Sequence, residues 1–104
     1  MALARSFRDT VKARLAREPA FRQALLAEAV NTLIEGDLET GKDVLRDFVN
    51  GTVGFHGLAE ETGTPAKSLM RMLGPRGNPT ASNLLAIVGA LQRRSGITLQ
   101  VRAA

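Results

Sequence analysis

The chain has no cysteine and no long apolar run. Without cysteine, its 104 residues can form neither a disulfide framework nor a thiolate metal site. Its apolar stretches fall well short of the roughly 18 consecutive residues that a membrane-spanning helix requires. The opening segment MALARSFRDT also lacks the apolar core of a signal peptide. We therefore expect a cytoplasmic protein in which residues 1–104 form a single domain.

Acidic side chains are scarce in the second half of the sequence. Residues 1–50 carry eight basic and eight acidic side chains, whereas residues 51–104 carry six basic side chains and only Glu60 and Glu61 as acids. This asymmetry favours a surface for a polyanion in the second half. Six basic residues are few, so an ordinary solvated surface is the alternative interpretation.

Residue sets of catalytic type are also missing. His56 is the single histidine, and Glu60, one helical turn further on, is its only neighbour of catalytic type. No nucleophile with a base and no pair of acids stands out at a useful spacing. The segment GPRGNP lacks the Gly-Lys-Ser/Thr ending of a Walker phosphate loop. We expect no enzyme, no cofactor and no metal site.

The first half of the chain predicts three helices. Ser6 can cap a first helix in which apolar residues recur at four-residue spacing, and Pro19 marks its end. The segment 20–36 has a broad apolar face and ends at Gly36. Asp37 can cap a third helix that continues to Asn50.

The second half predicts shorter helices. One or two turns end at Gly63, and a second short helix runs from Pro65 to Leu73. The turn RGNP follows, and Thr80 can cap a last helix. At 100° per residue, the inner arc of the second short helix contains Ala66, Leu69, Met70 and Leu73, and its outer arc contains Lys67, Ser68 and Arg71.

The outer arc raises the question of what neutralises its charge. Lys67 and Arg71 lie four residues apart, where like charges cost about 0.2–0.5 kcal/mol on a helix. Two short helices joined by a glycine turn, the second with a polar outer face, are typical of a helix-turn-helix, whose second helix enters the DNA major groove. A small helical bundle without a nucleic-acid partner fits this anatomy equally well.

The start of the last helix offers a second anion site. Thr80, Ser82 and Asn83 combine polar side chains with free backbone N–H groups, which suits a DNA phosphate. Plain N-capping by Thr80 is the alternative interpretation.

The segment LAEETGTPAKSLMRMLGPRGNPTASNLLAIVGAL resembles the helix-turn-helix region of addiction-module antidotes (antitoxins) and prophage-type DNA-binding regulators. The match covers roughly residues 52–101, and GNPT lies at the expected distance from Thr62 and Gly63. The resemblance implies a mainly α, phage-repressor-like helix-turn-helix bundle. Here the bundle would have extra N-terminal helices over residues 1–50, a core over 52–96 and a short C-terminal β-strand over 97–102.

The resemblance also implies a function. We expect a sequence-specific regulator of double-stranded DNA, associated with the nucleoid, that represses its own operon as an antitoxin and has a toxin protein as a further partner. The long helix pair before Asp37 departs from many relatives. A stand-alone repressor and a protein-interaction module that does not read DNA therefore stay open. The residues expected to contact DNA are Lys67, Ser68, Arg71, Arg76, Asn78, Thr80, Ser82 and Asn83.

The last segment, ITLQVR, has the alternation of a β-strand, with Ile97, Leu99 and Val101 on one face. No second strand is predicted in the chain. We therefore expect these three residues to serve dimerisation, through an antiparallel ribbon with the same segment of a second copy. Addition of this strand to the sheet edge of a toxin is the rival interpretation.

Overall fold

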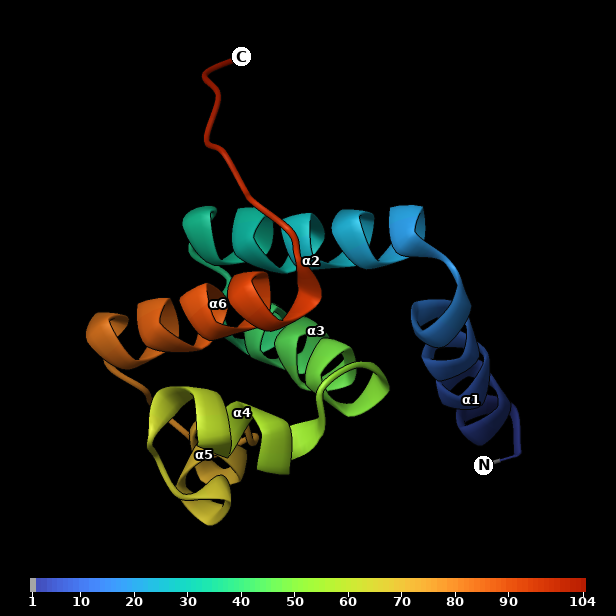
Figure 1. Cartoon of the computed structure of the whole chain (residues 1–104), viewed down its shortest axis with the longest axis horizontal. Coiled ribbons are helices and arrows are strands. Elements are labelled where there is room, and N and C mark those ends of the chain that lie inside the picture. The colour runs from blue at the N-terminus through green and yellow to red at the C-terminus, as the bar shows by residue number, and fades with distance from the viewer. Residues whose placement is uncertain (1) are drawn as a thin grey trace.

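The computed structural model describes the backbone of residues 2–104 and the side chains of residues 7–104. Within this range the protein is mainly α, as predicted, with six helices and no strand (Figure 1). None of the described helices has the length and apolar character needed to cross a membrane. The helices are α1 (Ala2–Arg17), α2 (Pro19–Ile34), α3 (Leu38–Gly51), α4 (Gly54–Thr62), α5 (Ala66–Met72) and α6 (Ala81–Ser95).

Most predicted helix boundaries of the first half are confirmed, but the predicted cap at Ser6 is wrong, because α1 already begins at Ala2. Pro19 is the first residue of α2, and Gly36 follows α2 with a left-handed φ of 95°. Asp37 caps α3, because its Oδ1 accepts a hydrogen bond of 3.1 Å from the backbone N–H of Thr40. Hydrogen bonding with Thr40 favours the charged carboxylate and lowers the pKa of Asp37 below its ordinary value of 3.8.

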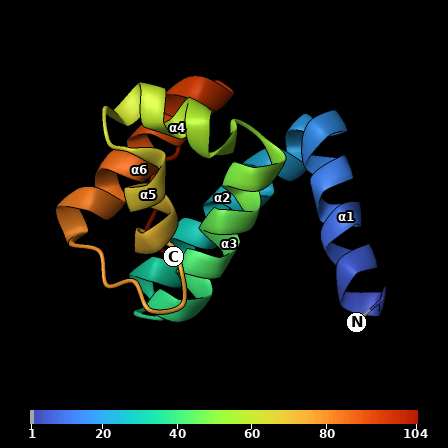
Figure 2. The same cartoon turned by 90° about the horizontal axis from the view of Figure 1, so that it is seen from below.

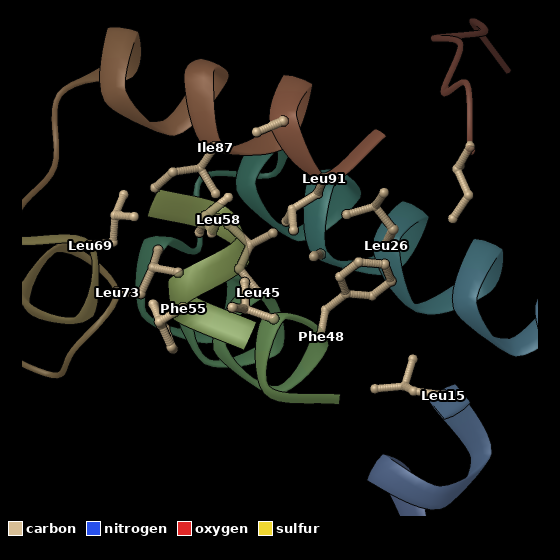
Figure 3. Packing of buried hydrophobic residues seen from close by; sticks show 14 residues of the cluster. Leu15, Leu26, Leu45, Phe48, Phe55, Leu58, Leu69, Leu73, Ile87 and Leu91 are labelled. Atoms are coloured by element: carbon tan, nitrogen blue, oxygen red, sulfur yellow. The ribbon is translucent and has the colours of Figure 1, made fainter. Parts of the chain in front are cut away.

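All six helices contribute to one core cluster. The helices α2 and α3 pack side by side, and α4, α5 and α6 close over them (Figures 1 and 2). Figure 3 shows how side chains from helices far apart in sequence meet at this centre. Its buried members include Leu26, Leu45, Phe48, Leu58, Leu69, Leu73, Ile87 and Leu91.

The helix α1 joins this body mainly through its C-terminal half. Leu15 is fully buried, Val11 is half-buried and Phe7 is 68% exposed. The contact at Leu15 is close, because a Cβ built on Gly51 would come within 2.5 Å of the Leu15 side chain. Both views show the start of α1 standing away from α4 and α5 (Figures 1 and 2).

The predicted C-terminal β-strand is not present. Residues 97–104 have no regular secondary structure, and the described part of the chain has no strand with which they could pair. Their first N–H groups bond to the end of α6 instead. The amide of Ile97 donates to the carbonyl of Gln92 (3.1 Å), and the amide of Leu99 donates to Oε1 of the same residue (2.7 Å). A strand needs an open backbone edge opposite it, which residues 2–104 of the single chain do not offer.

Candidate nucleic-acid interface

A tight turn separates the two short helices of the predicted site. Gly63 ends α4 with φ 74°, and its N–H donates to the carbonyl of Ala59 (2.8 Å). Glycine adopts this left-handed conformation without the steric cost that a Cβ brings. Pro65 then occupies the position before α5, which begins at Ala66. The predicted break and the predicted second helix are confirmed, with that helix one residue shorter at each end.

The buried side of α5 is rotated from the predicted arc. Leu69 and Leu73 are buried as predicted, but Met70 is 46% exposed and Met72 packs partly buried against the core. The prediction that Met70 joins the core is therefore wrong. Met72 gains its burial from the core cluster, against which it packs, while one side of it also lines a surface depression beside the following connection.

That connection, residues 73–80, is called the α5–α6 loop below. It approaches the end of α5 so closely that a Cβ on Gly77 would lie 2.2 Å from the carbonyl oxygen of Arg71 and 2.4 Å from that of Met72. Only glycine fits this approach. The N–H of Gly77 also donates to the carbonyl of Gly74 (3.0 Å), which closes a turn around Pro75 and Arg76.

The predicted cap of the last helix is confirmed. The backbone N–H of Asn83 donates to Oγ1 of Thr80 (3.1 Å). A capping hydroxyl that accepts one hydrogen bond still has its own O–H to donate. Thr80, Ser82 and Asn83 are all exposed, so this helix start is open to a ligand as well as capped.

Most of the predicted DNA-contacting residues come together. A surface depression of about 350 Å³ lies between α5, the loop and the start of α6, and we call it the α5–α6 depression. Lys67 and Ser82 lie outside its lining but are exposed on the first turns of α5 and α6. The predicted residues that line it are Ser68, Arg71, Arg76, Asn78, Thr80 and Asn83.

The basic residues here have no carboxylate partners. Lys67, Arg71 and Arg76 are exposed, and none makes an ion pair with any residue whose side chain the structure describes. At the other end of α6, by contrast, Arg93 donates to Glu61 at 2.8 Å and Arg94 lies 3.7 Å from Glu60. The depression therefore carries positive charge that the folded chain does not neutralise.

Sequence reasoning missed two basic residues behind this surface. Lys42 and Arg46 on α3 donate hydrogen bonds to carbonyl groups of the α5–α6 loop. A pattern that could have revealed Lys42 exists, because it falls on the same helical stripe as Leu38, Leu45 and Val49. A lysine inside an apolar stripe indicates a buried, partnered ammonium group.

The three residues predicted for dimerisation differ in how deeply they are buried. Ile97 is buried and Leu99 half-buried against the core of their own chain, whereas Val101 is 85% exposed.

Comparison of the chain with family models, with curated proteins and with solved structures finds no match in any of the three.

Proposed function

We propose that this protein is a regulator that binds double-stranded DNA, with α4 and α5 acting as a phage-repressor-like helix-turn-helix. The observation that carries the proposal is the pair of exposed cations Arg71 and Arg76 at the α5–α6 depression, with Lys67 exposed one turn before Arg71. None of the three has a carboxylate partner among the described side chains. Duplex DNA supplies a regular array of phosphates that matches such a surface.

The polar residues divide the work by chemistry. Arg71, exposed on α5, can read a guanine edge with two hydrogen bonds, while Lys67 on the first turn suits a phosphate. Thr80 and Asn83 at the start of α6, a helix of 15 residues, offer hydrogen-bond donors and the positive end of the helix dipole to a second phosphate. In this proposal the residues that contact DNA phosphates come before and after Arg71, the residue that reads the base, along the chain.

The biological role follows from the resemblance of residues 52–101 to antitoxins and prophage regulators. We propose repression of the chain's own operon, with a toxin protein as a second partner. A protein-interaction module is the competing function, and the length of the helices before Asp37 favours it. A protein that binds a toxin but no duplex would support that alternative.

Replacement of Arg71 tests the DNA-binding proposal. A duplex pool enriched on the wild-type protein supplies the probe, and fluorescence anisotropy gives the affinity. Arg71→Ala should weaken binding by about 1–3 kcal/mol, because a bidentate base contact is lost. Arg17→Ala is the matched control, since Arg17 is also exposed but lies on α1, away from α5. Equal affinities for the two variants would remove α5 from the reading role.

Homodimerisation is part of the proposal, because two copies are needed to read the two half-sites of a palindromic operator. Ile97 and Leu99 pack on their own core, which leaves the tail backbone and Val101 to meet a second copy. Deletion should therefore start at Gln100, so that the core stays intact. Sedimentation should show a dimer for the full chain and a monomer for the truncated one. A full chain that sediments as a monomer at high concentration would contradict this arrangement.

A further inference from the structure

We infer that Lys42 is a positioning residue for the DNA-contacting surface. Its ammonium group ties α3 to the α5–α6 loop, which carries Arg76 and Asn78. The inference rests on the proposed function for its DNA readout, but the tie itself is a feature of the fold.

The surroundings of Lys42 match an ammonium group closely. Its Nζ donates to the carbonyl oxygen of Gly77 at 2.6 Å and to that of Gly74 at 3.0 Å, and it lies 3.4 Å from Oε2 of Glu39. A lysine has three N–H donors, and three acceptors are present. The side chain is only 1% exposed. Burial of a charged group is tolerated when it is paired in this way.

Arg46, one turn further along α3, extends the same contact. Its Nη1 donates to the carbonyl of Leu73 (2.9 Å), and its Nη2 pairs with Asp43 (2.7 Å). The last carbonyls of a helix lack partners within the helix and carry partial negative charge. Two cations of α3 thus satisfy carbonyls at and just beyond the end of α5.

The tie matters because the α5–α6 loop after Leu73 has no buried side chain of its own. Leu69 and Leu73 are buried and hold α5, whereas residues 74–80 are half-buried or exposed. In Figure 2 the connection from α5 to α6 passes the N-terminal end of α3, where Lys42 lies. In the sequence, Arg76 lies between Gly74 and Gly77, whose carbonyl groups Lys42 binds. Lys42 therefore sets the position of a proposed DNA contact from inside the protein.

Such a residue acts on affinity by preorganisation. A loop that is already ordered loses less conformational entropy when it binds DNA. Lys42 is buried and contacts no phosphate itself. Its removal should weaken binding without changing the number of released counterions, which separates it from a lysine that touches DNA.

The absence of cysteine makes a direct test available. Lys42→Cys creates the single thiol of the chain. Alkylation in denaturant with bromoethylamine restores an ammonium group at lysine length, whereas alkylation with propyl iodide gives a neutral side chain of the same shape. Both forms are then refolded and compared with the wild-type protein.

The first readout is binding to the duplex pool enriched on the wild-type protein, measured at several salt concentrations. The aminoethyl form should bind within about threefold of wild type, and the propyl form should lose about tenfold or more through lost preorganisation, with the same salt slope. Equal affinity of the two forms would overturn the inference. A slope reduced by about one unit in the propyl form would also overturn it, since that indicates a phosphate contact.

The second readout is amide hydrogen exchange of residues 74–80, which needs no DNA. Exchange should be faster in the propyl form than in the aminoethyl form. A wild-type chain that binds no duplex would refute the proposed function, while this comparison would still decide whether Lys42 orders the loop. Equal exchange in both forms would overturn the tie itself.

If the propyl form does not fold, the Arg46→Met variant is measured in its place with the same two readouts. This variant removes the contact to Leu73 together with the ion pair to Asp43 within α3, and it should lower affinity by about threefold at an unchanged salt slope. Wild-type affinity and wild-type exchange in this variant would overturn the inference.

Discussion

The sequence contains the pattern Lys-x-x-x-Arg twice, in GKDVLRD on α3 and in AKSLMRM on α5, and the two copies meet opposite surroundings. On α3, Lys42 is buried and Arg46 half-buried, and both donate to carbonyl groups of the α5–α6 loop. On α5, Lys67 and Arg71 are exposed and have no carboxylate partner among the described side chains.

The two helices also differ in the residues beside these cations. Three positions before each cation of α3 there is an acid, Glu39 before Lys42 and Asp43 before Arg46, and both pairs form ion pairs. The corresponding positions before Lys67 and Arg71 are Thr64 and Ser68, which are not acids. Basic residues at the same spacing thus stabilise the fold in one helix and remain available to a ligand in the other.

The largest expected effect concerns folding stability. Lys42→Met should lower the free energy of unfolding by about 2–3 kcal/mol, because two loop carbonyls lose a buried donor. Lys67→Met should change it by less than about 0.5 kcal/mol, as is usual for an exposed residue. Urea unfolding followed by circular dichroism measures both values. Similar losses for the two variants would break the distinction between the helices.

A smaller effect concerns the salt dependence of DNA binding. Lys67→Ala should reduce the slope of log affinity against log salt by about one unit, because one phosphate contact is lost. Anisotropy titrations on the enriched pool and on a scrambled duplex should show the same loss for both. An unchanged slope would show that Lys67 is an ordinary solvated residue. This result would support the alternative interpretation of residues 51–104, in which their basic side chains form a solvated surface without a polyanion.

The smallest effect concerns Asp37, which begins the helix that carries Lys42. Because its pKa in the folded state is lowered, Asp37 contributes stability above the ordinary value of 3.8, and this contribution is lost as the pH falls through the lowered pKa. Asp37→Asn keeps a capping side chain without a titrating group. Its unfolding free energy should therefore fall less than that of the wild type on acidification to pH 3. Parallel pH profiles for the two proteins would argue against this stabilisation.

The sequence by itself determined most helix boundaries. Gly36 and Gly63 end helices, and Asp37 and Thr80 begin them, as predicted. These outcomes follow from local chemistry, since a cap joins a side chain to an N–H three residues away. The outward position of Lys67 and Arg71 was predicted for the same reason, because helical periodicity separates them from Leu69 and Leu73.

Only the tertiary structure decided which methionine of α5 is covered, where the C-terminal tail bonds and what Lys42 does. Met72 packs partly buried against the core cluster whereas Met70 is exposed, and ITLQVR stays unpaired because the described chain offers no second strand. Lys42 meets carbonyls 32 and 35 residues away in sequence. Local periodicity carries no information about such partners, because they come together only when the helices pack.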